Sequence, residues 1–159
     1  MEKKLTILIA DDNTYMKDMV EFSIKNDERF EIIGVAENGE KEIELIKELK
    51  PNIVITDLKK GNNWSGLDII RKIKANSEYV PIFFIISAST HYYFQEIMKL
   101  GVRYFLNKPC NNDRILEKLE EIYNDVYPKK IIILQDNKIE TDNRNFFYKL
   151  LHTLKKRMS

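Results

Sequence analysis

Five short apolar runs alternate along this chain with five segments whose apolar residues recur at helical spacing. The runs are rich in β-branched residues and span 5–10, 30–36, 53–57, 81–87 and 102–107. Runs of this length, bounded by turn residues, are typical of strands buried on both faces. Strict alternation of strands and helices predicts a parallel sheet with helices on both sides. We therefore expect an α/β fold with a doubly wound, five-stranded parallel sheet.

Helix signals fill the gaps between the runs. Apolar spacing predicts helices within 16–24, 43–49, 67–73, 90–100 and 115–122. Pro51 ends the second of these helices, and Gly101 is predicted to close the fourth in the left-handed conformation. Asn111 or Asn112 opens the fifth.

The composition fits one domain with a small extension. A length of 159 residues and a hydrophobic fraction of 43% are sufficient for a packed core. The single cysteine, Cys110, has no partner for an internal disulfide and favours a reducing compartment. The apolar runs are too short for a membrane span, and the first ends in two acids, unlike a secretory signal. We therefore expect a cytoplasmic protein without a membrane segment.

The charge is distributed unevenly. The whole chain carries +1, but residues 128–159 hold eight basic and three acidic residues, a net of +5, which leaves −4 on the rest. We expect a boundary near Tyr127-Pro128, with a first domain at 1–127 and a basic C-terminal extension at 128–159. Within the extension, the pattern predicts a short strand at 131–134 and a helix around 146–154.

Two interpretations of the extension stay open. We favour a helix that docks on the body or on a second subunit. The sharper alternative is that its basic face, or an effector domain that begins there, contacts nucleic acid. No membrane partner is expected.

Polar residues follow four of the five predicted strands at the point where each ends. These residues are Asp11 and Asp12, Asp57, Ser87 and Lys108. The carboxyl ends of parallel strands meet at one edge of a sheet, where ligands usually bind. Three carboxylates in one small cleft repel each other, and Mg²⁺ is the usual compensating ion because it prefers carboxylate and water oxygens.

This set of groups is suited to phosphoryl transfer. Asp57 would attack in line, while Mg²⁺, Lys108 and Ser87 would meet the charge on the phosphoryl oxygens. Each residue also has a structural explanation. The acidic pair would cap a helix, Asp57 would make a turn, Ser87 would bond to backbone and Lys108 would lie in a solvated loop. Their joint position at one edge favours a site.

Residues 4–126 resemble the receiver domain of two-component response regulators, which has the chemotaxis-regulator-like fold. The matching residues are Asp11-Asp12, Asp57, Ser87-Ala88 and Lys108-Pro109. The resemblance implies a flavodoxin-like (βα)5 sandwich of three layers. It also implies that Asp57 is the phosphoacceptor and that Ser87 and Lys108 contact the phosphoryl group.

The resemblance assigns further roles. Asp12 would bind Mg²⁺ directly, Asp11 would act through water, and the backbone carbonyl of Lys59 would be another ligand. Phe105 matches the aromatic switch position, whose ring turns inward when Ser87 moves. The stretches 10–13, 33–39 and 104–105 are similar to the receiver of the sporulation-initiation regulator, a transcription regulator.

The sequence departs from the family pattern after the phosphoacceptor. Lys60-Gly61 and Ser65-Gly66 stand where the family usually has Met-Pro and Asp-Gly, with one extra residue in the loop. Cys110 stands where Phe is usual. We expect these changes to affect phosphorylation kinetics more than the fold, with Lys59 either shielding a phosphoaspartate or occupying the site.

The expected function is a phosphorylation-activated signalling switch. A sensor histidine kinase or a phosphotransfer protein would donate the phosphoryl group to Asp57, and the domain would catalyse this transfer without being a metabolic enzyme. Phosphorylation would drive homodimerisation through the face formed by the fourth and fifth helices. Two alternatives remain: a phosphorylation-independent pseudo-receiver scaffold, and a small Mg²⁺-dependent phosphatase. Lys59 argues against the phosphatase, because it stands where a second acid would be needed.

Overall fold

The computed structural model describes residues 4–60 and 64–128. Its main sheet has five parallel strands in the order β2-β1-β3-β6-β7, so β3 is central. The strands are β1 (Leu5–Ala10), β2 (Phe30–Ala36), β3 (Ile53–Thr56), β6 (Ile82–Ser87) and β7 (Tyr104–Asn107). The predicted strands and their parallel arrangement are confirmed.

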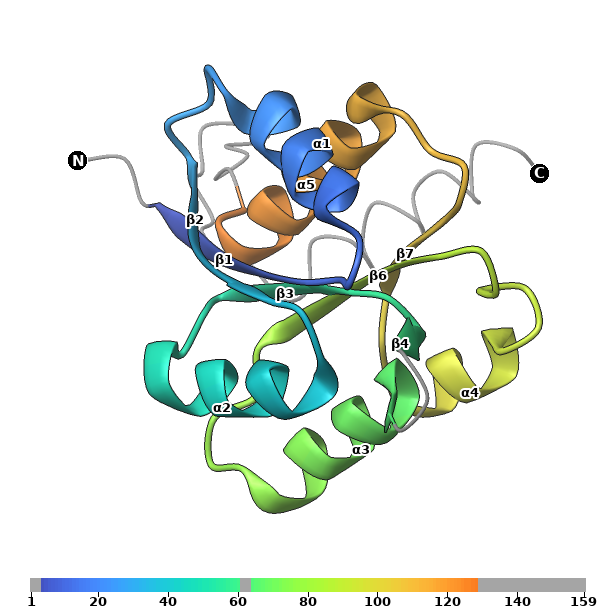
Figure 1. Cartoon of the computed structure of the whole chain (residues 1–159). Coiled ribbons are helices and arrows are strands. Elements are labelled where there is room, and N and C mark those ends of the chain that lie inside the picture. Colours follow the sequence, from blue (N-terminus) through green and yellow to red (C-terminus); the bar gives the residue numbers. More distant parts are fainter. Residues whose placement is uncertain (1–3, 61–63, 129–159) are drawn as a thin grey trace, which may run out of the picture. The chain divides into compact units, whose positions relative to one another are not determined.

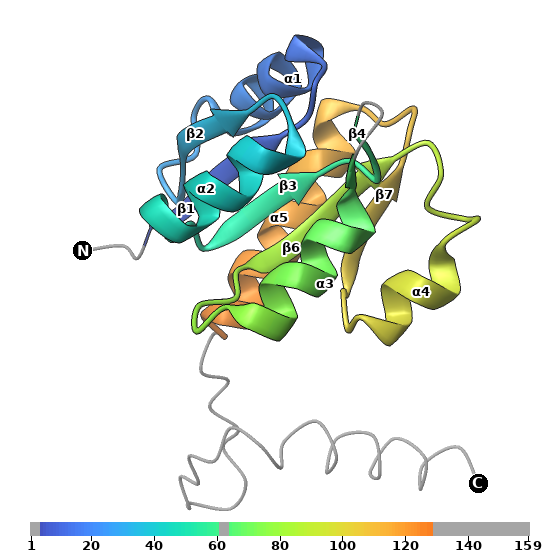
Figure 2. The ribbon, with the colours of Figure 1, turned by 60° about the horizontal axis from the view of Figure 1, so that its bottom comes forward.

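Five helices cover the sheet in two layers, as Figures 1 and 2 show. Helices α1 and α5 lie on one face, and α2, α3 and α4 lie on the other. Their bounds are α1 (Thr14–Ile24), α2 (Gly39–Leu49), α3 (Gly66–Asn76), α4 (Phe94–Lys99) and α5 (Asn112–Val126). This three-layer, doubly wound arrangement is the predicted flavodoxin-like fold.

The central strand is buried because both of its faces pack against helices. All four residues of β3 are at most 1% exposed. Its register sets Ile53 beside Ile7 of β1 and beside Ile82 of β6. The same register pairs Ala10, the last residue of β1, with Thr56, the last residue of β3, so the chain leaves both strands at one edge of the sheet. Asp11 and Asp57 therefore emerge next to each other.

Helix α4 is shorter than the sequence predicts. The expected helix at 90–100 is an α-helix only from Phe94, while the N–H groups of Tyr92 and Tyr93 both donate to the carbonyl of Ser89 in turns. Gly101 closes the helix with φ +68°, as predicted. Its N–H donates to the carbonyl of Met98, which satisfies one of the free carbonyls at the helix end.

A two-stranded hairpin stands where the sequence predicts a loop. Strands β4 (Lys59–Lys60) and β5 (Trp64–Ser65) pair in antiparallel fashion directly after β3. Two-residue strands carry no periodic signal, which is why the pattern missed them. The hairpin returns the chain to Ser65, whose hydroxyl accepts a hydrogen bond from the N–H of Leu67 at 3.2 Å and caps α3.

The strand and helix predicted at 131–134 and 146–154 lie outside the described residues, so these features and the boundary at 127–128 stay predictions. Among the helices that the structure describes, none combines the length and the apolar character that a membrane span needs.

Candidate functional site

Three of the polar residues that follow the strands are joined by one ammonium group. Nζ of Lys108 lies 2.6 Å from Oδ2 of Asp57 and 2.9 Å from Oδ2 of Asp11. Lys108 follows β7, whereas the two acids follow β3 and β1. The prediction that these strand ends form one cluster is confirmed for these residues.

Asp57 is fixed from several sides. Its side chain is only 12% exposed, and its Oδ1 accepts a hydrogen bond from the backbone N–H of Lys59 at 3.0 Å. The cation bonded to its other oxygen is Lys108, so Lys59 contacts Asp57 through its backbone, and its side chain is exposed. In this structure Asp57 therefore has a cationic partner other than Lys59.

Gly66 lies against the backbone of Asp57, and sequence reasoning did not identify its role. A Cβ atom at Gly66 would lie 2.2 Å from the carbonyl oxygen of Asp57, far inside van der Waals contact. The N–H of Gly66 donates to the carbonyl of Leu58 at 3.0 Å. The hairpin thus brings the start of α3 so close to the backbone of Asp57 that a side chain at Gly66 has no space. The Ser65-Gly66 pair in the sequence is the only signal that could have indicated this contact.

The charges in the cluster stabilise each other. Burial acts to raise the pKa of Asp57, but hydrogen bonds from Lys108, Ser87 and the Lys59 N–H outweigh it and hold that pKa below its ordinary value. Burial likewise acts to lower the pKa of Lys108, but its bonds to Asp57 and Asp11 raise it. Asp57 is therefore an ionised carboxylate at neutral pH, which is the form that a nucleophile needs.

The acidic pair is divided between two environments. The Asp11 side chain is 3% exposed, and its Oδ1 accepts from the N–H of Asn13 at 2.8 Å. Asp12 is exposed. Asn13 itself caps α1 by accepting from the N–H of Tyr15, so the alternative that the acidic pair caps this helix is wrong.

The predicted metal ligands are only partly assembled. Within residues 4–60 and 64–128, no three His, Cys, Asp or Glu side chains gather as a group that could hold a metal ion. Oxygens of Asp11 and Asp57 nevertheless converge on one cation, the Lys108 ammonium. These are hard oxygen donors, so the residues fit Mg²⁺ chemically, and the exposed Asp12 follows Asp11 in the sequence. The roles of Asp12 and of the Lys59 carbonyl stay predictions.

Ser87 and Phe105, the predicted switch residues, lie on the neighbouring strands β6 and β7, and their switch role stays a prediction. Ser87 is 1% exposed, and its hydroxyl oxygen accepts a hydrogen bond from the N–H of Ser89 at 3.3 Å. Its hydroxyl also contributes to lowering the pKa of Asp57. Phe105 is half-buried, and its ring meets that of Phe94 edge-on with a centroid distance of 5.8 Å.

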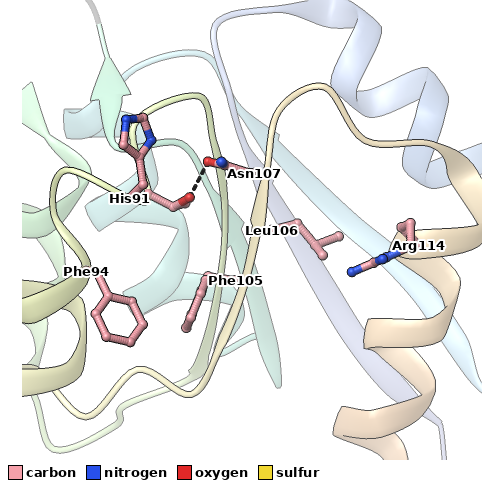
Figure 3. A pocket seen from close by; sticks show the side chains of 7 residues that line it. His91, Phe94, Phe105, Leu106, Asn107 and Arg114 are labelled. Carbon is pink, nitrogen blue, oxygen red and sulfur yellow. Dashed lines mark hydrogen bonds between the residues drawn. The ribbon is translucent and has the colours of Figure 1, made fainter.

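A groove opens beside Phe105, as Figure 3 shows. Its volume is about 570 Å³. It is lined by the rings of Phe94 and Phe105, by Asn107 at the end of β7, and by Arg114 of α5. Thr90 also lines the groove, and its hydroxyl donates a hydrogen bond to Asn107. Sequence reasoning assigned no role to Thr90 or Asn107, because neither residue stands in a recognisable motif.

Comparisons with known proteins agree with this geometry. Residues 7–120 match the sequence profile of the response regulator receiver domain. The chain is 37% identical over 130 residues to an uncharacterized transcriptional regulatory protein, YesN, of Bacillus subtilis, which covers 78% of this chain and 35% of that protein. It is 31% identical over 117 residues to the chemotaxis protein CheY of Listeria monocytogenes, which covers 74% of this chain and 97% of that protein. The chain thus spans about a third of the first relative and nearly all of the second.

Solved structures show the same fold. The N-terminal domain of an uncharacterized protein from Wolinella succinogenes superposes with a TM-score of 0.65 at 32% identity, covering 77% of this chain and 96% of that one. The response regulator domain of Thermotoga maritima CheB superposes with a TM-score of 0.67 at 20% identity and with the same coverage of both chains. At this identity the likeness shows the fold alone. The chain therefore belongs to the response regulator receiver domain family, the phosphorylation-activated modules of two-component signalling.

Proposed function

We propose that Asp57 accepts a phosphoryl group from a sensor histidine kinase or a phosphotransfer protein. The observation that carries this proposal is the pairing of an ionised, largely buried Asp57 with the ammonium of Lys108 at 2.6 Å, beside the Ser87 hydroxyl. A carboxylate nucleophile with adjacent cation and hydroxyl donors is what phosphoryl transfer requires.

Asp57, Lys108 and Ser87 would each have a separate role in the transfer. A carboxylate oxygen of Asp57 would form the new bond to phosphorus, while the phosphorus–nitrogen bond of the donor histidine breaks and its electron pair stays on the imidazole. Lys108 would then exchange its bond to the Asp57 carboxylate for one to a phosphoryl oxygen. Ser87 would donate its hydroxyl to another phosphoryl oxygen. Lys108 is already within hydrogen-bonding distance of Asp57, so little rearrangement of that group is needed.

A magnesium ion fits the same residues. Asp11, Asp12 and Asp57, with the backbone carbonyl of Lys59, would hold it. Bound there, it would supply positive charge for the phosphoryl oxygens. Lys108 now forms ion pairs with both Asp11 and Asp57, so we expect it to be displaced from at least one of them when a divalent cation binds.

The output is proposed to run through α4 and α5. Movement of the Ser87 hydroxyl toward the phosphoryl group would leave space for the ring of Phe105 to turn inward. Helix α4 and the turn before it expose Tyr92, Phe94 and Met98, of which Tyr92 is 78% exposed. Apolar groups gathered on a surface favour an interface, and a homodimer of phosphorylated chains is the partner we propose.

The biological output is proposed to be transcriptional, because the YesN relative is described as a transcriptional regulatory protein. In this proposal the domain is a switch that catalyses its own phosphorylation and dephosphorylation, and not a metabolic enzyme. The narrower resemblance to a sporulation regulator and any contact of the basic extension with nucleic acid stay predictions.

Phosphorylation by a small donor tests the proposal. The full chain is incubated with acetyl phosphate, with and without Mg²⁺, and its intact mass is measured. Wild type and the exposed control Asp113→Asn should gain one phosphoryl group with Mg²⁺, and Asp57→Asn should gain none while its circular dichroism is unchanged. No gain by wild type would favour the pseudo-receiver scaffold. Many turnovers of released phosphate per chain would favour the phosphatase.

A further inference from the structure

The side chains of Thr90 and Asn107 join the connection between β6 and α4 to the end of β7. The hydroxyl of Thr90, a residue only 4% exposed, donates to Oδ1 of Asn107 (Figure 3). Thr90 lies three residues after Ser87, and Asn107 is followed directly by Lys108. The bond therefore links the two strand ends that carry the groups expected to bind the phosphoryl oxygens.

The backbone of Asn107 is already tied to β6. In the sheet register Asn107 lies opposite Ser87, and the N–H of Lys108 donates to the carbonyl of Ser87 at 3.0 Å. The Asn107 side chain adds a second connection, which reaches beyond the sheet to the segment that follows Ser87. Strand β7 thus restrains both the strand end and the start of the connection to α4.

Two other hydrogen bonds of that connection are long, while the N–H of Tyr92 donates to the Ser89 carbonyl at 3.1 Å. The N–H of Ser89 donates to the Ser87 hydroxyl oxygen at 3.3 Å, and the N–H of Tyr93 donates to the Ser89 carbonyl at 3.3 Å, both long for hydrogen bonds. A Ser87 hydroxyl that moves toward a phosphoryl group would weaken the first of these bonds. The Thr90 bond to Asn107 does not involve Ser87, so it would oppose movement of the connection after that first bond weakens.

We propose that Thr90 and Asn107 form a latch that holds the β6–α4 connection, and with it the start of α4, in the resting position. The functional consequence rests on the proposed function, since it concerns the response to phosphorylation at Asp57. The bond is made in the resting conformation and broken when the connection follows Ser87, so it adds to the free-energy difference between the two conformations. Phe94, four residues after Thr90, carries the effect to the ring of Phe105.

Two substitutions at Thr90 separate the latch from simple packing. Thr90→Val removes the hydroxyl but keeps the branched shape, whereas Thr90→Ser keeps the hydroxyl and loses a methyl group. Loss of one neutral hydrogen bond changes a conformational ratio by about 2- to 10-fold. We expect Thr90→Val to raise the opening of residues 88–100 by this factor, and Thr90→Ser to behave like wild type.

Amide hydrogen exchange of the full chain, measured by mass spectrometry without any phosphate donor, tests the latch. Exchange in 88–100 that rises in Thr90→Val and in Asn107→Ala, but not in Thr90→Ser, supports it, provided that exchange in β1 and β3 is unchanged. The double variant should exchange no faster than either single variant, because both remove the same bond. Unchanged exchange in Thr90→Val, a rise throughout the sheet, or additive effects in the double variant would overturn the proposal.

A second measurement separates this proposal from the proposed function. Acetyl phosphate and Mg²⁺ are added, and the exchange of 88–100 is compared before and after. After phosphorylation, the amide exchange rate of residues 88–100 in wild type should rise toward the rate that Thr90→Val shows without phosphate. Absence of phosphate on Asp57 in every variant refutes the proposed function, and the comparison without donor still decides whether the latch exists.

Discussion

Nζ of Lys108 lies 2.6 Å from Oδ2 of Asp57, and the same ammonium reaches Asp11 at 2.9 Å. One cation thus compensates two acids that would otherwise repel each other at the edge of the sheet. The pair of bonds gives the resting site a defined geometry, and it also places Lys108 in competition with any other cation for the same oxygens.

Replacing Lys108 with Met should destabilise the fold and increase the effect of Mg²⁺. Removing one partner of a fully buried ion pair costs ~3–5 kcal/mol, and we expect less, about 1–3 kcal/mol, because the Lys108 side chain is 26% exposed. Urea unfolding with and without Mg²⁺ measures both effects. The control is Lys41→Met, which removes the exposed ion pair with Glu44 and should lower the stability much less, because solvent screens that pair. Equal losses in the two variants would contradict this role of Lys108.

Gly66→Ala should disturb the site, because its Cβ would lie 2.2 Å from the Asp57 carbonyl oxygen and backbone atoms cannot yield easily. Overpacking of this kind costs about 1–3 kcal/mol. The matched control is Gly34→Ala, whose Cβ would meet only side-chain ends of Leu49 and Leu8 at 3.0 and 3.1 Å. Urea unfolding and phosphorylation by acetyl phosphate should both show a larger loss for Gly66→Ala. A smaller loss for Gly66→Ala than for Gly34→Ala would show that the hairpin backbone can shift to accommodate the Cβ atom.

Asp12→Ala should weaken Mg²⁺ binding while leaving the metal-free protein stable. Asp12 is exposed in this structure, so its removal breaks no buried contact. Asp11→Ala should instead destabilise the metal-free fold, because it removes the acceptor of bonds from Lys108 and Asn13. Thermal unfolding over a range of Mg²⁺ concentrations measures both quantities, since a ligand raises the midpoint according to its affinity. Equal Mg²⁺ affinity in wild type and Asp12→Ala would refute the predicted direct ligand.

Tyr104 should titrate late and should stabilise the fold up to high pH. Burial, followed by the hydrogen bond from its hydroxyl to Oδ2 of Asp125 at 2.6 Å, raises the pKa of Tyr104 to about 12. The folded-state pKa lies above the ordinary value of about 10. Its contribution is therefore complete below pH ~10 and is lost as the pH rises through about 12.

Ultraviolet absorbance across alkaline pH checks this prediction. Tyr104→Phe should lose the ionisation near pH 12, and its stability relative to wild type should recover over the same interval. The exposed Tyr92→Phe serves as control and should keep that ionisation. Persistence of the late ionisation in Tyr104→Phe would assign it to another residue.

The local pattern of the sequence was enough to predict the strands, the helices and the polar residues that follow them. Period and composition are local properties, so a buried run such as 53–56 and a helix end such as Gly101 can be read from neighbouring residues alone. The edge on which Asp57, Ser87 and Lys108 lie follows from the parallel arrangement, without knowledge of the strand order.

Contacts between distant segments could be decided only by the tertiary structure. The order β2-β1-β3-β6-β7 places the ends of β1 and β3 side by side, and this lets one Lys108 ammonium reach both Asp11 and Asp57. The close approach of Gly66 to Asp57 depends on a hairpin too short to leave a periodic signal. The late start of helix α4 at Phe94 follows turns that local propensity did not indicate, and the bond from Thr90 to Asn107 depends on where β7 lies.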